Sequence, residues 1–131
     1  MDRRTLLRTT GYWAAAGLGT AGLAACARPD PVYNAGGVFV GRAPLRQRGE
    51  QIKRAGVALG WIMQDVQPGL IRGTLNLRTH QAVVDVPYTQ TNFSIQYVSS
   101  TNLEYDGVTI HPNYNRWIRN LEQRIAAESS I

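Results

Sequence analysis

The stretch that decides the fold is Gly69–Ser100, "GLIRGTLNLRTHQAVVDVPYTQTNFSIQYVSS". Apolar and polar residues alternate through it in three runs, over residues 69–79, 81–89 and 92–100. A period of two is typical of strands that bury one face and expose the other. Because the connections between the runs are short, the sequence predicts a three-stranded antiparallel meander.

Helical patterns flank this meander on both sides. Leu45–Gln64 and His111–Glu128 each place apolar residues three or four apart, as one face of an amphipathic helix requires. The predicted fold class is therefore α+β. We expect a two-layer sandwich of helix, three-stranded antiparallel meander and helix, with Trp61 and Trp117 between the layers. The Asp106–Gly107 pair marks a turn at which an extra short hairpin can form.

Composition and charge narrow the class of protein. The chain has 131 residues, of which 44% are apolar and 18% charged, as in one ordinary globular domain. Its net charge is +5, and without the first ten residues it is +3, from eleven basic and eight acidic side chains. So small a charge does not indicate a nucleic-acid partner. The single cysteine excludes both an internal disulfide and a cysteine-based zinc site.

The first 25 residues have the organisation of a secretory signal peptide. A basic opening with Arg3, Arg4 and Arg8 precedes Gly11–Ala25, a run of fifteen residues without charge. As a helix this run would span about 22 Å, which is short of the ~30 Å hydrocarbon core of a bilayer. The pattern therefore favours a cleaved segment over a membrane-spanning helix.

The four residues Leu23–Cys26, "LAAC", resemble the bacterial lipobox. This resemblance implies that a diacylglycerol is attached to the sulfur of Cys26 and that a peptidase then cuts before this cysteine. Two or three acyl chains would hold the protein stably in a membrane, because each buried CH₂ contributes about 0.8 kcal/mol. We expect a cleaved lipoprotein signal peptide over 1–25, a flexible tether over 26–44 and an α+β globular domain over 45–128.

The export route and the final membrane are less narrowly defined by sequence. Asp2–Arg8, "DRRTLLR", resembles the twin-arginine export signal, although Asp2 and Leu6 depart from that pattern, and a general export signal is the equal alternative. By resemblance to enteric lipoproteins, Ala27 after the cysteine favours the outer membrane. The expected location is the cell membrane, lipid-anchored and facing the periplasm, with the outer membrane somewhat favoured.

Three segments of the mature region stand out: "GLIRGTLNLRTHQAVVDVPY", "SIQYVSSTNLEYDG" and "IHPNYNRWIRNLEQRI". Together they resemble a group of small uncharacterised bacterial envelope lipoproteins. The group implies a folded domain behind a lipid anchor and brings no activity with it.

No catalytic, metal or cofactor site is predicted. Thirty residues separate His80 from His111, which is not the spacing of a metal pair, so surface or capping roles are expected for both. No serine lies in a Gly-x-Ser-x-Gly elbow, and no glycine-rich phosphate loop is present.

The second face of the predicted sheet is the main candidate for partner binding. Its candidate residues are polar or charged: Arg72, Arg78, Asp85 and Gln96. Such a surface would suit an acidic partner or a glycan. The plainer alternative is a solvated sheet face on which Asp85 pairs with an arginine for about 0–1 kcal/mol. The loop Ser99–Gly107 is a second candidate.

Two functions remain open at this point. The first is a lipid-anchored binding or structural accessory that engages an envelope protein or glycan. The alternative is a small envelope hydrolase acting on cell-wall material, for which His80 and Asp85 are the first pair to test. In the predicted register these two side chains project from opposite faces of the sheet, which disfavours the hydrolase.

Overall fold

The computed structural model describes residues 28–131, so the predicted signal peptide and Cys26 lie outside the described residues. The elements are β1 (Asp30–Pro31), β2 (Ala35–Val38), α2 (Leu45–Ala58), β3 (Ile62–Gln67), β4 (Leu70–Leu77), β5 (His80–Pro87), β6 (Asn92–Thr101), β7 (Thr109–Ile110) and α3 (Pro112–Glu128). Neither of the helices in this part of the chain is long and apolar enough to cross a bilayer.

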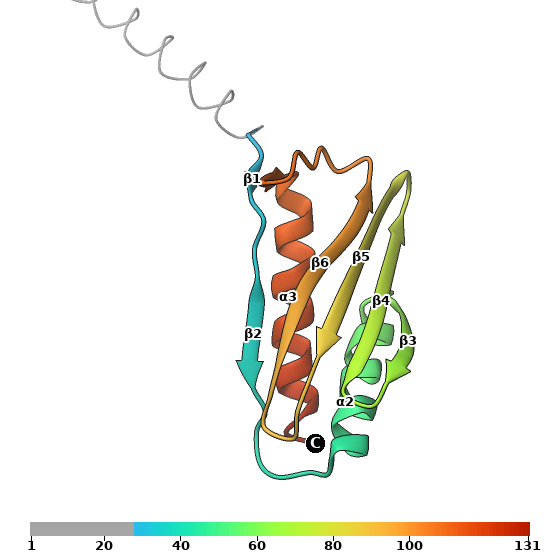
Figure 1. Cartoon of the computed structure of the whole chain (residues 1–131), viewed down its shortest axis with the longest axis vertical. Coiled ribbons are helices and arrows are strands. Elements are labelled where there is room, and N and C mark those ends of the chain that lie inside the picture. Colours follow the sequence, from blue (N-terminus) through green and yellow to red (C-terminus); the bar gives the residue numbers. More distant parts are fainter. Residues whose placement is uncertain (1–27) are drawn as a thin grey trace, which may run out of the picture.

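The main sheet has five antiparallel strands in the order β2-β6-β5-β4-β3, and both helices lie on one of its faces (Figure 1). The predicted three-stranded meander is therefore wrong, although its three strands are present as β4, β5 and β6. The side chains between the sheet and the helices form a single core; those fully buried in it include Ile52, Ile71, Val84, Ile95, Tyr114, Ile118 and Leu121. Trp61 is buried in this core as predicted, whereas Trp117 is only half-buried.

The predicted end of the first helix is also wrong: α2 stops at Ala58, whereas the sequence pattern predicted a helix as far as Gln64. Gly60 has φ +92°, a left-handed conformation that favours glycine. The Trp61 amide donates to the Gly56 carbonyl and the Gly60 amide to the Val57 carbonyl, which is a Schellman arrangement. The chain then reverses, and Ile62–Gln67 pairs with β4 as an edge strand.

The prediction of a flexible tether over residues 26–44 is wrong for residues 30–44. Asp30–Pro31 and Ala35–Val38 are strands, and β2 pairs with β6 along its whole length. Ala35 and Phe39 are buried in the core. The folded part of the chain thus begins well before Leu45.

The expected extra hairpin around Asp106–Gly107 is also absent from the fold. β7 pairs with β1, not with the residues before the turn. The Asp106 carboxylate accepts hydrogen bonds from the Val108 and Thr109 amides, so the turn closes on its own side chain. This side-chain turn competes with the backbone hairpin.

Helix α2 carries a buried arginine, Arg48, that is only 1% exposed. Its guanidinium donates from Nε to the Gln90 carbonyl at 2.9 Å and from Nη2 to the Gly41 carbonyl at 2.8 Å. It also bonds the Gln51 side chain and lies 4.5 Å from the centre of the Phe39 ring. Arg48 therefore joins the β2–α2 connection, the β5–β6 turn and the helix.

The two helices are joined by Glu128, which accepts from Arg54 at 3.1 Å and from Arg124 at 3.2 Å. These hydrogen bonds, chiefly that from Arg54, lower the pKa of Glu128 below its ordinary value of 4.5. A lowered carboxyl pKa stabilises the fold above the unfolded-state pKa, and this stabilisation is lost as the pH falls through the folded-state value.

We expect Glu128→Gln to reduce the free energy of unfolding at pH 7 and to have less effect in acid. At neutral pH the variant loses a charged acceptor for two arginines, whereas the wild-type carboxyl loses the same advantage as the pH falls from the unfolded-state pKa through the lowered folded-state pKa. Urea denaturation of both proteins at pH 7 and pH 3 measures this difference. A difference that stays the same at both pH values would contradict the assignment.

Candidate binding groove

Three of the predicted partner-binding residues lie in one row across the uncovered face of the sheet. Arg72 is opposite Asp85, and Asp85 is opposite Gln96, on the neighbouring strands β4, β5 and β6. Arg72 donates to both carboxylate oxygens of Asp85, from Nε at 2.8 Å and from Nη2 at 3.0 Å. The two charged side chains thus form an ion pair with each other, and this leaves fewer of their donors and acceptors free to bind a partner.

The fourth residue, Arg78, is not part of this row. It lies in the two-residue turn between β4 and β5, with φ +58°. In Figure 1 this turn is at the upper end of the domain, the end at which the described chain begins. The structure therefore does not bring the four predicted residues together as one site.

The two histidines, which the sequence did not connect, lie close together. Their ring centres are 6.3 Å apart, and the ring centre of His80 is 6.4 Å from that of Trp117. His80 donates from Nδ1 to the Asn102 carbonyl at 2.7 Å, since a carbonyl can only accept. His111 accepts the Asn113 amide on its own Nδ1 and so caps α3, which is one of the two roles expected for it.

Metal binding and the proposed catalytic pair find no support in these contacts. His80 faces the helices whereas Asp85 is paired with Arg72 on the other face, as the predicted register required. Among residues 28–131, no three histidine, cysteine, aspartate or glutamate side chains converge as metal ligands.

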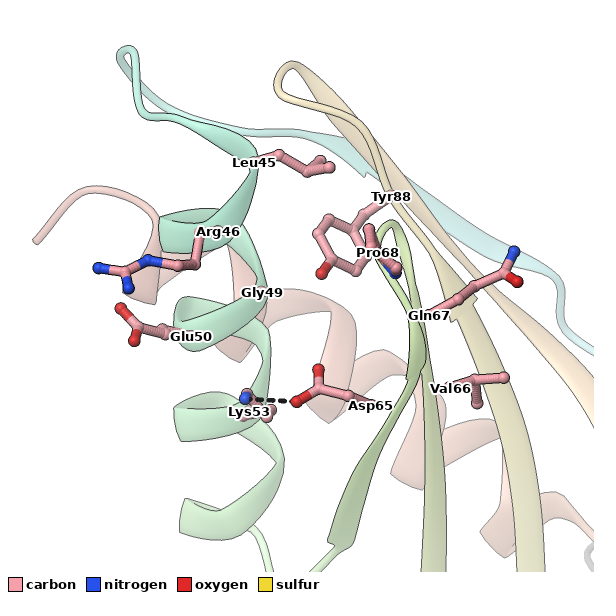
Figure 2. A pocket seen from close by; sticks show the side chains of 10 residues that line it. All are labelled: Leu45, Arg46, Gly49, Glu50, Lys53, Asp65, Val66, Gln67, Pro68 and Tyr88. Atoms are coloured by element: carbon pink, nitrogen blue, oxygen red, sulfur yellow. Dashed lines mark hydrogen bonds and ion pairs between the residues drawn. The ribbon is translucent and has the colours of Figure 1, made fainter.

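The site that sequence reasoning missed is a groove of about 590 Å³ between α2 and the edge strand β3 (Figure 2). Ten residues line it, five from the helix and five from β3, the β3–β4 turn and the residue after β5: Leu45, Arg46, Gly49, Glu50, Lys53, Asp65, Val66, Gln67, Pro68 and Tyr88. A second hollow shares Leu45, Pro68 and Tyr88 and continues along residues 89–91.

Charged groups face each other across this groove. Lys53 Nζ is 2.8 Å from Asp65 Oδ2, and this hydrogen bond raises the pKa of Lys53 above its ordinary value. Lys53 thus remains charged at neutral pH. Arg46 and Glu50 extend from the same helix toward solvent (Figure 2), so the groove presents charges of both signs.

Tyr88 supplies an uncommitted polar group to the groove. Its hydroxyl forms no hydrogen bond with any residue of the described chain, and in Figure 2 it points toward α2. A Cβ atom at Gly49 would lie 2.5 Å from this hydroxyl oxygen, so only glycine at that position leaves room for the ring. The phenol is therefore held in place by packing while its hydroxyl stays available to a ligand.

The two edges of the main sheet differ in how their backbone groups are covered. In β2 the Gly36 amide donates to Glu122 of α3, and just after β2 the Val40 amide donates to Ser129, the residue that follows α3, each at 2.9 Å. Side chains from α3 and its C-terminal end therefore occupy that edge. Along β3, the backbone groups that face away from β4 form no hydrogen bond with residues 28–131, and this open edge borders the groove.

The charged side chains that line the groove are two carboxylates, Glu50 and Asp65, and two cations, Arg46 and Lys53. No serine, cysteine or histidine is among the lining residues, and the lysine is paired with Asp65.

Comparison with protein-family models, with curated proteins and with solved structures finds no match to this chain.

Proposed function

We propose that this protein is a lipid-anchored binding module of the bacterial cell envelope. A lipid on Cys26 holds it in the membrane facing the periplasm, and the groove between α2 and β3 binds an extended segment of an envelope protein. The "LAAC" sequence supports the anchor, and the open edge of β3 supports this form of recognition.

The observation that carries the proposal is the position of the groove relative to β1, the first strand of the described chain. The described chain begins beside β1, and the groove lies at the opposite end of the domain, where α2 begins and β3 turns into β4 (Figure 1). A lipid on the N-terminal side of β1 would therefore leave the groove facing away from the bilayer.

An extended peptide is the ligand that this groove fits best. It can add to the open edge of β3 through backbone hydrogen bonds, while side-chain contacts with Tyr88 and the Lys53–Asp65 pair provide selectivity. Anchoring both partners at one membrane raises their effective concentration, so a weak contact of this kind is sufficient.

Photo-crosslinking in intact cells tests the proposal. A photoreactive phenylalanine replaces either Gln67 in the groove or Gln96 on the sheet face, both of them exposed glutamines on strands. We expect position 67, and not position 96, to yield a defined crosslinked protein. Crosslinking only at position 96 would instead support the row Arg72–Asp85–Gln96 as the binding surface. Crosslinking at neither position would contradict the proposal that an envelope protein binds this domain.

Tyr88→Phe is expected to weaken partner recovery by about twofold to tenfold, the worth of one hydrogen bond. Because the hydroxyl has no partner among the described residues, the free energy of unfolding should change by less than about 0.5 kcal/mol. Tyr97→Phe is the matched control, since its hydroxyl bonds Ser100 at 2.7 Å. The control should lose stability and keep binding; the opposite pattern would contradict the role of Tyr88.

A further inference from the structure

The chain is fixed to the domain from Asp30 onward. β1 pairs with β7, and the Val32 amide donates to the Val108 carbonyl at 3.1 Å. The buried side chain of Asn115 donates to the Pro31 carbonyl at 2.8 Å and accepts the Tyr33 amide at 2.9 Å. The segment before β2 is therefore held against α3 by several hydrogen bonds.

This attachment leaves little chain between the domain and the predicted lipid. Asp30 is four residues after Cys26. Four extended residues reach at most about 14 Å. If the lipid is carried by the sulfur of Cys26, the end of the domain that holds β1 and β7 stays next to the bilayer surface.

Two further segments lie at this same end. The β4–β5 turn is joined to the loop after β6, because His80 Nδ1 donates to the Asn102 carbonyl at 2.7 Å and the Asn102 side chain donates to Thr79 at 2.8 Å. Figure 1 shows both segments, like β1, at the upper end of the domain. They form one surface with the start of α3.

Apolar side chains are exposed on this surface. Val108 is 70% exposed, Leu77 is 45% exposed and Tyr105 is 42% exposed. Tyr105 stacks on Tyr97 with ring centres 4.2 Å apart, which holds the loop side chain in place. Other large apolar side chains of residues 28–131 are also exposed, such as Val38 and Ile131, so exposure alone does not mark a contact surface. Leu77, Tyr105 and Val108 differ from these because they lie at the end that a lipid on Cys26 would hold beside the bilayer.

The charges at this end are balanced. Three arginines and three acidic residues are present: Arg28, Arg78, Arg116, Asp30, Glu104 and Asp106. The Asp106 carboxylate is already engaged by the Val108 and Thr109 amides. Electrostatic attraction to anionic lipids therefore contributes little to the free energy of membrane binding. Contact with a bilayer must rely on the apolar side chains.

We propose that this end of the domain rests on the membrane, with Leu77, Tyr105 and Val108 in contact with the lipid interface. The proposal rests on the anchor of the proposed function, and it adds an orientation: the domain does not swing freely but stands on its β1–β7 end. Tyrosine suits this position because its ring is apolar and its hydroxyl remains in water.

Fluorescence quenching by brominated lipid tests this orientation. The chain from Cys26 to Ile131, which contains the whole core, is coupled through its only thiol to a maleimide phospholipid in vesicles. Val108→Trp places the probe at the proposed contact, and Val38→Trp is the matched control because Val38 is 72% exposed on a different part of the domain. Quenching of the parent chain, from Trp61 and Trp117, is subtracted.

We expect brominated phosphatidylcholine to quench the probe at position 108 and to leave the probe at position 38 bright, also in high salt. Equal quenching at both positions, or quenching at 108 only with anionic lipid, would overturn the proposal. Because the coupling is chemical, this result does not depend on lipidation in the cell. Failure of the anchor is detected separately, as the absence of a lipid on Cys26 in the cellular protein.

Discussion

Arg48→Met is expected to lower the free energy of unfolding by about 2–4 kcal/mol, because the guanidinium supplies hydrogen bonds that no apolar side chain replaces. The lost donors would leave the Gln90 and Gly41 carbonyls without a protein partner. Methionine keeps most of the apolar stem, so the loss reports mainly the hydrogen bonds and the contact with the Phe39 ring. Urea denaturation at pH 7 measures the change.

Arg46→Met is the control for this prediction. Arg46 lies two residues earlier on the same helix and is exposed, so its removal should change stability by less than about 0.5 kcal/mol. Arg48→Lys is expected to lose most of the stabilisation that Arg48→Met loses, since an ammonium does not reproduce the planar fork of donors. Equal stability of the Arg48→Met and Arg46→Met proteins would contradict the structural role of Arg48.

Cys26→Ala is expected to abolish the attachment of lipid to the protein. Without the thiol no thioether to diacylglycerol can form, so the precursor should remain uncut and fail to incorporate a fatty-acid analogue. The acyl chains that would hold the mature protein in the membrane are then absent. Fatty-acid labelling, together with the length of the chain on a gel, measures the outcome.

The control for this prediction changes the neighbouring residue instead. Ala25→Gly keeps a small side chain before the cysteine, as the lipobox resemblance requires, and should be processed and labelled normally. If the Cys26→Ala protein were still labelled and still cut, another part of the chain would have to carry the lipid.

The sequence predicted β4, β5 and β6 well because each strand buries one face and exposes the other. Val84 and Val86 are buried while Asp85 between them pairs with Arg72 outside, and this contrast is visible as alternation. Because this pattern depends only on which residues are buried, it can be recognised in the sequence of a single strand without knowledge of the strands beside it.

Strand β3 was missed because its first residue continues the spacing of the helix before it. Ile62 follows Leu59 by three positions, as another turn of α2 would require, yet Ile62 is 57% exposed. Gly60 was the available signal, since its left-handed conformation ends the helix. As an exposed edge strand, β3 has no buried face to give the alternation of its neighbours.

Strand β2 was missed for a different reason. Its two glycines read as a linker, but a Cβ at Gly37 would lie 3.0 Å from the Phe93 ring. Glycine there reflects the close approach of an aromatic side chain, and that approach depends on tertiary packing. Sequence alone does not separate this role from flexibility.

The groove could not be predicted once β3 had been read as helix. Lys53 and Asp65 are twelve residues apart, and they meet only because the chain reverses at Gly60 and returns beside α2. The predicted face, in contrast, was placed correctly for Arg72, Asp85 and Gln96, because a row across strands follows from their register.

The account depends on a lipid carried by Cys26, and the mass of the N-terminal peptide from membrane-derived protein tests it most directly. Because trypsin does not cut the Arg28–Pro29 bond, this peptide runs from Cys26 to Arg42. The account predicts a peptide that begins at Cys26 and carries the added mass of a diacylglycerol. A peptide without added lipid, or a chain that retains Met1, would contradict it.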